Sequence, residues 1–212
     1  GDVYLHDFTI VGNISAANQI GVLLRDYYSL IERVNVYNTL SRSIEITHLN
    51  NAAVAVGSTL VNNKVKNIRT SGTGPLYLGA DDNNKITDGV VDDVVLGIHA
   101  TSQYALYIGS SAGWFVDKVH TEGNTATENS VYISNAFHTN IGAIYCESSG
   151  VAAKPVVNFT KIQKKLSVAS LCVTISTATA IAVSAGKSGA VSSAQVSIGS
   201  LVVDNSGANA VT

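Results

Sequence analysis

Apolar residues recur along this chain in two short patterns that repeat every 22 to 34 residues. In the first pattern, two apolar residues stand three positions apart, and an apolar residue or a threonine usually follows two positions later. It begins at Leu5, Ile31, Val65, Val91, Val116, Ile141, Val168 and Ile198. A period of roughly 20 to 50 residues indicates repeats that stack into a solenoid, and the two-residue step is typical of a β-strand. The three-residue step predicts a bend between two short strands.

The second pattern is a pair of apolar residues separated by a single residue. It occurs at Val22/Leu24, Ile44/Ile46, Leu76/Leu78, Leu106/Ile108, Val131/Ile133, Val157/Phe159 and Ile181/Val183. Between Tyr104 and Cys146 both patterns advance by 25 residues, from 106 to 131 and from 116 to 141. Because the two patterns share one drifting period, each repeat contains two or three short strands that stack on their equivalents. We therefore predict an all-β fold, a right-handed parallel β-helix of about seven coils in one domain spanning residues 1–212.

Stacking also predicts contacts on the outside of the coils, because neighbouring strands lie about 4.8 Å apart. Four ion pairs are expected between neighbouring coils: Asp7 with Arg33, Glu32 with Lys66, Lys66 with Asp92, and Asp93 with Lys118. Such an exposed charge ladder contributes little per pair. The same register places Cys146 inward and Cys172 outward, so no disulfide is expected between these two cysteines.

The residue between the two apolar positions of the second pattern should face outward. Along the chain it reads Leu23, Glu45, Tyr77, Tyr107, Tyr132, Asn158 and Ala182. Three tyrosines on adjacent coils predict a flat, stacked strip, with Tyr77, Tyr107 and Tyr132 as candidate substrate-binding residues. Aromatic faces with hydroxyl groups suit sugar rings. The alternative is an aromatic ladder that only stabilises the stack.

Cleavage of a glycosidic bond requires paired carboxylates roughly 5 to 9 Å apart. Near the tyrosine strip the sequence offers Asp26, Glu45, Asp81 and Asp82 as candidate catalytic residues. Solvated acids at turns are the alternative reading of all four. The segment 109–113 matches the G-x-S-x-G nucleophile elbow, but a further β pattern follows it where that motif needs a helix.

Composition narrows the classes of function. Hydrophobic residues make up 46% of the chain and charged residues only 13%, and the net charge is −2 without a basic cluster. A nucleic-acid partner is not expected, since phosphates would need a stripe of lysine or arginine. No apolar run reaches 18 residues, so membrane insertion is not expected. The five histidines lack zinc-ligand spacing, so we expect neither a metal site nor a cofactor.

The segment 166–212 differs from the rest of the chain. Its only charged residues are Lys187 and Asp204, and small side chains dominate it. Either these coils are slim, or they are buried against another subunit in an oligomer. Neither end of the chain shows a cap, although the open edges of a β-helix need cover. We therefore expect a fragment of a longer chain, or ends covered by partners.

The segments Asp7–Asn13 and Ile31–Val36 are similar to coil sequences of phage tailspikes, and the repeat as a whole resembles the pectate-lyase-like right-handed β-helix superfamily. The resemblance implies an extracellular homotrimer in a virion tail spike or appendage. It also implies binding of a host surface polysaccharide, and its depolymerisation by a glycoside hydrolase or lyase. No catalytic signature of the family is present, so a non-catalytic structural or receptor-binding shaft is the alternative.

Overall fold

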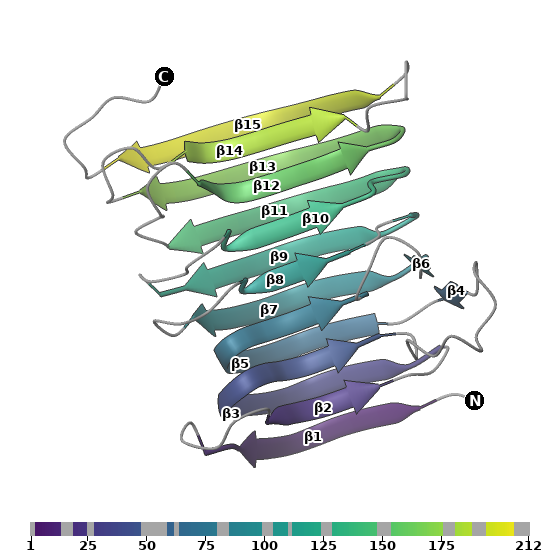
Figure 1. Ribbon diagram of the computed structural model, residues 1–212, viewed down its shortest axis with the longest axis vertical. Helices are drawn as coiled ribbons and strands as arrows, with labels where there is room; N and C mark the ends of the chain where they lie inside the picture. Colours follow the sequence, from purple (N-terminus) through teal and green to yellow (C-terminus); the bar gives the residue numbers. More distant parts are fainter. Residues whose placement is uncertain are drawn as a thin grey trace.

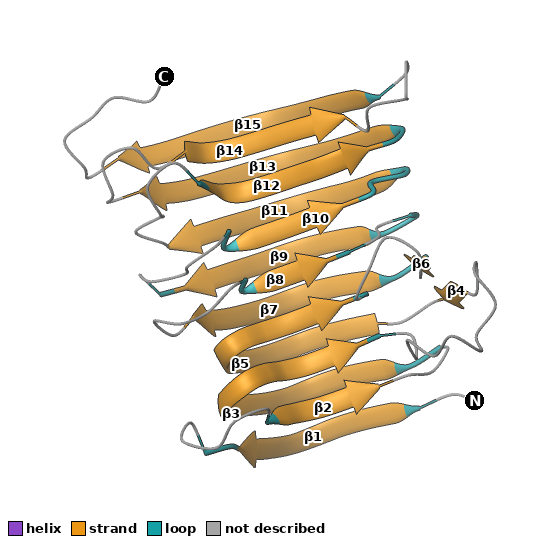
Figure 2. Cartoon of the chain, in the orientation of Figure 1, coloured by secondary structure: helices purple, strands orange, loops and turns teal. Residues whose placement is uncertain are grey.

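Parallel strands stacked in coils make up the described part of the chain, as Figures 1 and 2 show. A computed structural model describes residues 3–13, 19–24, 28–47, 59–61, 64–79, 85–98, 104–109, 112–123, 129–147, 154–175, 181–187 and 194–205. Its strands are β1 (Tyr4–Val11), β2 (Ile20–Leu24), β3 (Leu30–Ile46), β4 (Thr59–Val61), β5 (Lys64–Leu78), β6 (Lys85–Thr87), β7 (Val90–Ile98), β8 (Leu106–Ile108), β9 (Phe115–Glu122), β10 (Val131–Ser134), β11 (Thr139–Glu147), β12 (Pro155–Ile162), β13 (Lys165–Ile175), β14 (Ile181–Lys187) and β15 (Gln195–Asn205). Within these ranges no helix is long and apolar enough to cross a membrane.

Two ladders of parallel strands form the walls of the solenoid. The first ladder contains β1, residues 30–37 of β3, residues 64–72 of β5, β7, β9, β11, β13 and β15. The second ladder contains β2, residues 42–46 of β3, residues 76–78 of β5, β8, β10, β12 and β14. Figure 1 shows β3 and β5 bending round one edge of the molecule, so that each contributes to both ladders. The predicted parallel β-helix is confirmed.

The strand registers confirm the first pattern along its whole length. Each starting residue pairs with the next one in the series, from Leu5 on Ile31 to Val168 on Ile198. The second pattern is confirmed as far as β12, but its last step is wrong. Val157 pairs with Val183, two residues beyond the predicted Ile181. A slip of two residues preserves the alternation between the faces, so the pattern of apolar residues cannot detect it.

A residue in the left-handed conformation makes the bend in the first ladder. It occupies the third position of the first pattern in five successive coils, with φ between 47° and 58°: Asp7, Arg33, Asn67, Asp93 and Lys118. An extended strand points alternate side chains to opposite faces. One left-handed residue interrupts this alternation, so that residues three positions apart both point inward. The predicted bend therefore has a definite backbone cause.

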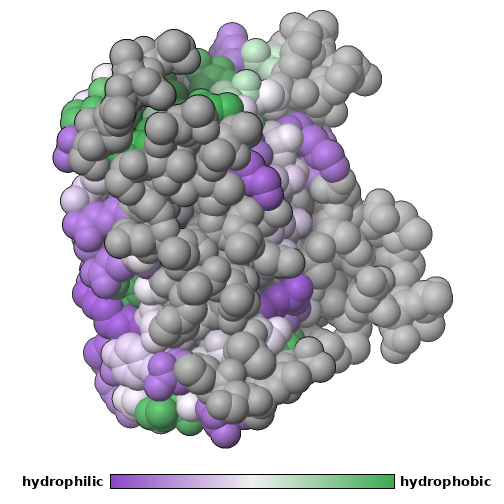
Figure 3. All heavy atoms as spheres, turned by 60° about the vertical axis from the view of Figure 1, so that its left-hand side comes forward, coloured by the Kyte–Doolittle hydropathy of each residue, from purple (hydrophilic) through white to green (hydrophobic). Residues whose placement is uncertain are grey.

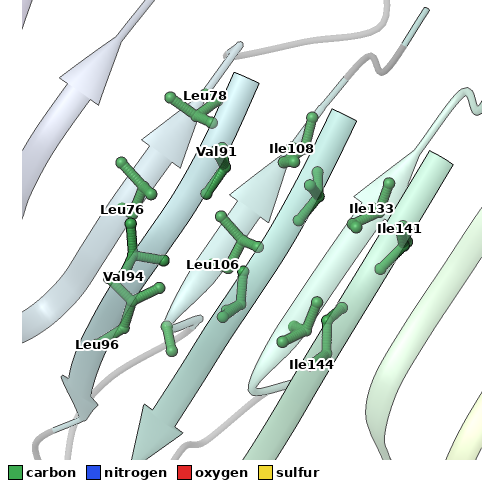
Figure 4. Packing of buried hydrophobic residues seen from close by; sticks show 14 of the residues in the cluster. Leu76, Leu78, Val91, Val94, Leu96, Leu106, Ile108, Ile133, Ile141 and Ile144 are labelled. Atoms are coloured by element: carbon green, nitrogen blue, oxygen red, sulfur yellow. The ribbon is translucent and has the colours of Figure 1, made fainter. Parts of the chain in front are cut away.

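The core is a continuous stack of apolar side chains between the two ladders. Figure 4 shows Leu76 of the second ladder beside Val94 of the first, and both belong to the buried core. Trp114 is also fully buried, and Gly89 makes room for it. A Cβ atom at Gly89 would lie 2.4 Å from the Trp114 ring, so that position excludes any side chain.

The two cysteines lie as predicted. Cys146 is buried in the core, Cys172 is partly exposed, and both are free. Burial raises the pKa of the Cys146 thiol to about 12. The thiol therefore stays protonated at neutral pH and packs as an apolar group.

The predicted charge ladder is confirmed at its first pair. Arg33 donates to both carboxylate oxygens of Asp7, at 2.6 and 2.8 Å, and this hydrogen bonding holds the pKa of Asp7 well below its usual value. The predicted pair of Glu32 with Lys66 is absent among the described residues. Glu32 instead contacts Arg33 at 2.7 Å and accepts a hydrogen bond from Tyr4 at 2.9 Å. Arg33, a closer cation within the same coil, thus takes the place of Lys66 from the next coil as the partner of Glu32.

The upper part of the charge ladder is shifted relative to the prediction. Lys118 lies 3.6 Å from Asp92 instead of contacting Asp93. Asp93 lies 3.6 Å from Arg69. Lys66 forms no ion pair with Asp92 in the described part of the chain. Long cationic side chains reach diagonally across coils, so register alone does not determine their partners.

Two neighbouring valines of β7 test which side chains point into the core and which point outward. Val94 is fully buried, whereas Val95 faces outward and is partly exposed. Val94→Ala should lower the free energy of unfolding by about 2 kcal/mol, because it removes apolar contact and leaves a cavity. Val95→Ala should change it by no more than about 0.5 kcal/mol. Urea unfolding measures both, and equal losses would contradict the assignment.

Candidate functional site

The three predicted tyrosines form one stack on the outer face of the second ladder. Tyr77 of β5, Tyr107 of β8 and Tyr132 of β10 occupy paired positions in adjacent coils. The ring centroids of Tyr77 and Tyr107 are 4.1 Å apart with 5° between the planes. Those of Tyr107 and Tyr132 are 5.0 Å apart with 7° between the planes. We call these three residues the tyrosine ladder.

Two further side chains pack against the tyrosine ladder, and neither is among the residues that the sequence predicts for this site. Tyr104 tilts against Tyr107 and Tyr132, with centroids 5.2 and 5.3 Å away. The guanidinium carbon of Arg42 lies 3.9 Å from the centroid of the Tyr77 ring, in a cation–π arrangement. Both stand three positions before an outward residue of the second pattern, which is the signal that could have revealed them.

Gly74 separates Arg42 from Tyr104 in this outer column. It pairs with Arg42 across β3 and β5. A Cβ atom at Gly74 would lie 3.4 Å from Cγ of Arg42 and 3.2 Å from the carbonyl oxygen of Ser41. The missing side chain leaves the Arg42 stem free to cross toward the Tyr77 ring. A Cβ atom here would make an ordinary contact with Arg42 and a tight contact with the Ser41 carbonyl.

Glu45 anchors the lower end of the ladder. Its carboxylate lies 2.5 Å from Nη1 of Arg42 and is buried, and the residue pairs with Tyr77 in the next coil. A buried carboxylate in this ion pair holds Arg42 over the ring, which is a positioning role. The other three predicted acids, Asp26, Asp81 and Asp82, lie outside the described residues, so their catalytic role stays a prediction.

The stacking geometry determines what the ladder can offer a ligand. Tyr77 and Tyr132 cover both faces of Tyr107, and Arg42 covers the second face of Tyr77. A sugar ring cannot lie flat on these covered faces. At Tyr77 and Tyr107 a ligand would therefore meet ring edges and hydroxyl groups.

The hydroxyl groups of Tyr77 and Tyr107 are neutral at physiological pH. Burial raises the pKa of Tyr77 to about 12 and raises that of Tyr107 well above its usual value. A neutral phenol both donates and accepts hydrogen bonds. The ladder thus offers hydrogen-bonding groups and no general base at neutral pH.

Amide side chains continue the polar column above the tyrosines. Asn158 pairs with Tyr132 in the next coil and donates to Oδ1 of Asn129 at 3.2 Å. In the neighbouring corner, Gln163 donates to Oδ1 of Asn135 at 3.4 Å. At the last coil the outward position is Ser184 and not the predicted Ala182, as a result of the two-residue slip. Amides and hydroxyls together are suitable partners for sugar hydroxyls.

A second polar cluster lies on the first ladder, where the sequence predicts no site. Glu122 of β9 and Glu147 of β11 are paired in adjacent coils and half-exposed. His120 lies between them, with Nδ1 3.6 Å from Glu122 and Nε2 3.9 Å from Glu147. Tyr145 donates to Glu147 at 2.8 Å, and this bond raises the pKa of Tyr145. The repeat of His-x-Glu as Tyr-x-Glu 25 residues later, from 120 to 145, is the signal that could have revealed this cluster.

Other candidate sites have weaker geometry. Among the described residues, no group of three or more histidine, cysteine, aspartate or glutamate side chains could hold a metal ion. A hollow of about 460 Å³ lies beside Val3, Tyr4, Tyr28 and Leu30, at the first two coils. The G-x-S-x-G segment leads into strand β9 and not into a helix, and its two serines lie outside the described residues.

No protein-family model matches this chain, and no curated protein or solved structure matches it either. The solenoid fold is therefore established by the strand pairings alone. A β-solenoid is compatible with many functions. Any function must accordingly be argued from the side chains of the two outer faces.

The raised pKa values predict a loss of stability at alkaline pH. Tyr77 has a pKa of about 12 in the folded chain and about 10 when unfolded, so its neutral form favours folding. This contribution is fully present below about pH 10 and is lost as the pH rises toward 12. Tyr77→Phe should therefore move the alkaline unfolding midpoint, followed by circular dichroism, to higher pH. Tyr28→Phe, at an exposed ring outside the stack, is the matched control. An equal shift of the midpoint in Tyr28→Phe would show that ionisation of Tyr77 is not the cause of the alkaline loss of stability.

Proposed function

We propose that this chain is a non-catalytic, receptor-binding shaft of a virion tail appendage, and that the tyrosine ladder contacts a host surface polysaccharide. The supporting observation is the regular column in which Tyr77, Tyr107 and Tyr132 stack and Asn158 continues the series. Each of these coils presents one hydrogen-bonding side chain in the same direction.

The spacing of this column suits an extended polymer. Equivalent residues on neighbouring coils lie about 4.8 Å apart, so the hydroxyl and amide groups recur at short, regular intervals. A polysaccharide also presents its hydroxyl groups at regular intervals along the chain. Several hydrogen bonds of about 1 kcal/mol each together support binding, although no single contact is strong.

The proposed shaft is rigid because every coil is fixed by its neighbours. The tyrosine ladder depends on this rigidity, since the rings stay stacked only while β5, β8 and β10 keep their register. The homotrimer is part of the proposal. Small outward side chains on the last coils support it, including Ser170 and Ser200, which pair between β13 and β15. Such a surface allows close approach of a second subunit.

The hydroxyl groups can be tested without disturbing the stack. Tyr132→Phe keeps the ring but removes one hydroxyl, so binding to a panel of bacterial surface polysaccharides should weaken about fivefold, the equivalent of one hydrogen bond. Tyr37→Phe, at an exposed tyrosine of the first ladder outside both polar clusters, is the matched control and should leave affinity unchanged. Undiminished binding by both Tyr132→Phe and Tyr107→Phe would show that the tyrosine ladder does not bind the polysaccharide.

A second candidate function rests on the cluster around Glu122 and Glu147. Paired positions on adjacent coils place these two carboxylates close together, near the separation of about 5 Å that retaining glycosidases use. The Tyr145 hydroxyl bonded to Glu147 makes the two acids unequal, as an acid and a nucleophile must be. The second candidate is therefore a depolymerase acting on the same class of glycan.

One assay separates the two candidates. For the shaft we expect binding but neither new reducing ends nor unsaturated uronates after incubation with the bound polysaccharide. For the depolymerase, products appear, and Glu122→Gln and Glu147→Gln each lower their rate by at least about a hundredfold. Asp93→Asn, at a partly exposed acid on the same ladder, is the control. Cleavage that survives both glutamine variants would point to Asp26, Asp81 and Asp82.

A further inference from the structure

Four tyrosine rings lie in contact on the outer face of the second ladder. Tyr104 packs against two members of the tyrosine ladder, with its ring centroid 5.2 Å from that of Tyr107 and 5.3 Å from that of Tyr132. Its centroid is also 6.3 Å from that of Tyr77. All four residues are partly exposed, so a reagent in solvent reaches them. The cluster therefore permits chemistry between one ring and another, in addition to contact with a ligand.

The four rings differ in how they face one another. Tyr77, Tyr107 and Tyr132 form parallel pairs, with 5° and 7° between neighbouring planes. Tyr104 is tilted instead, by 54° against Tyr107 and by 49° against Tyr132. Parallel rings present their faces to each other, whereas tilted rings meet with an edge. The edge of a tyrosine ring carries Cε1 and Cε2, the carbon atoms beside the phenolic carbon, and two tyrosines couple at these atoms.

Coupling at the Cε atoms forms dityrosine. Each of two phenols gives up one electron and its phenolic proton, which leaves a radical shared between the oxygen and the Cε atoms. The two radicals join through a new Cε–Cε bond. The hydrogen on each bonded carbon then leaves as a proton and each oxygen takes up a proton, so that both phenols are restored. Hydrogen peroxide receives the two electrons and the two protons and becomes two molecules of water, and the protein loses two hydrogen atoms.

We propose that Tyr104 and Tyr132 are an oxidative modification site, at which hydrogen peroxide as the oxidant produces a dityrosine crosslink between neighbouring coils. The two residues belong to adjacent coils, because Leu106 of β8 pairs with Val131 of β10. The crosslink would therefore join the residues beside β8 to strand β10. This inference rests on the ring geometry and is independent of the function proposed for the tyrosine ladder.

Tyr132 is a better partner for Tyr104 than Tyr107 is. Neighbouring rings cover both faces of Tyr107, whereas the residue that follows Tyr132 in the column is Asn158. Tyr132 can therefore turn toward Tyr104 with the loss of one stacking contact, and Tyr107 would lose two. Burial also raises the pKa of Tyr107 well above its usual value, which opposes the loss of its phenolic proton during oxidation.

Proximity distinguishes this pair from the more exposed tyrosines. Tyr28 and Tyr37 are 54% and 36% exposed, so an oxidant reaches both. Neither contacts another aromatic ring among the described residues, so their radicals couple only between chains. Figure 3 shows a mainly hydrophilic and intermediate surface on the side that it presents, with separate hydrophobic areas. Tyr104 and Tyr132 are already in contact, and such positioning gives coupling within one chain a large advantage.

The crosslink should stabilise the coils that carry the tyrosine ladder. It closes a loop from residue 104 to residue 132, and a closed loop of this kind restricts the unfolded chain. The midpoint of thermal unfolding should therefore rise by about 5 °C or more in the crosslinked protein.

The test oxidises the full chain in dilute solution with a haem peroxidase and hydrogen peroxide. We expect dityrosine fluorescence in a band of monomer mass on a denaturing gel, a mass lower by two hydrogens, and a crosslinked peptide that contains Tyr104 and Tyr132. Tyr104→Phe and Tyr132→Phe should each lower the yield of this band at least about tenfold, because a phenylalanine ring forms no phenoxyl radical. Tyr37→Phe is the matched control and should keep the full yield and the rise in midpoint.

Three results would overturn the proposal. Oxidation of Tyr28 and Tyr37 without dityrosine in the monomer band would show that the cluster does not couple. A crosslinked peptide that joins Tyr104 to Tyr107 would show that the modification stays within one coil. Dityrosine found only between chains, with a yield that falls on dilution, would show that no pair is positioned for coupling. The peptide map of the wild-type chain requires no variant, so it decides the outcome even if circular dichroism shows that a variant does not fold.

Discussion

Parallel backbone pairing between successive coils is the constraint on which the rest of this structure depends. Every described strand of the two ladders runs parallel to its neighbours, and the first ladder holds one register from Leu5 to Ile198. Because the register is fixed, a residue acquires as lateral neighbours the residues one repeat before and one repeat after it. Side chains of one kind can therefore line up over several coils, as the three tyrosines do.

This constraint also explains why both polar features are columns and not pockets. Stacking places Glu147 directly beside Glu122, with His120 between them and the Tyr145 hydroxyl donating to Glu147. On the second ladder, stacking favours ring-on-ring contact and so covers the aromatic faces. The same interaction that aligns the tyrosines thus removes the flat surface that a sugar ring would prefer, and only edges and hydroxyls remain for recognition.

The fold was predictable because its signal is periodic, whereas the site depends on individual side chains. Every pairing of the first pattern follows from apolar spacing, but the slip that places Val183 on Val157 keeps the same face inward and leaves no trace in that spacing. The tyrosine stack follows from register. The contact of Arg42 with the Tyr77 ring does not, since it depends on the direction that one long side chain takes beside Gly74 of the neighbouring coil. Likewise, the length and direction of the Lys118 side chain determine that it pairs with Asp92 and not with Asp93.

The position of the tyrosine ladder along the solenoid affects how long its rings stay stacked before local unfolding separates them. A stack in which each coil contacts only its neighbours opens from its ends inward. Among the described strands, β1 and β15 hold partly buried apolar residues, so their amide hydrogens should exchange before those of the fully buried coils. Tyr77, Tyr107 and Tyr132 lie in interior coils whose flanking residues, such as Leu106 and Ile133, are fully buried. Opening of the less buried strands therefore leaves the tyrosine ladder intact, and its lifetime is set by the opening of the fully buried coils that carry it.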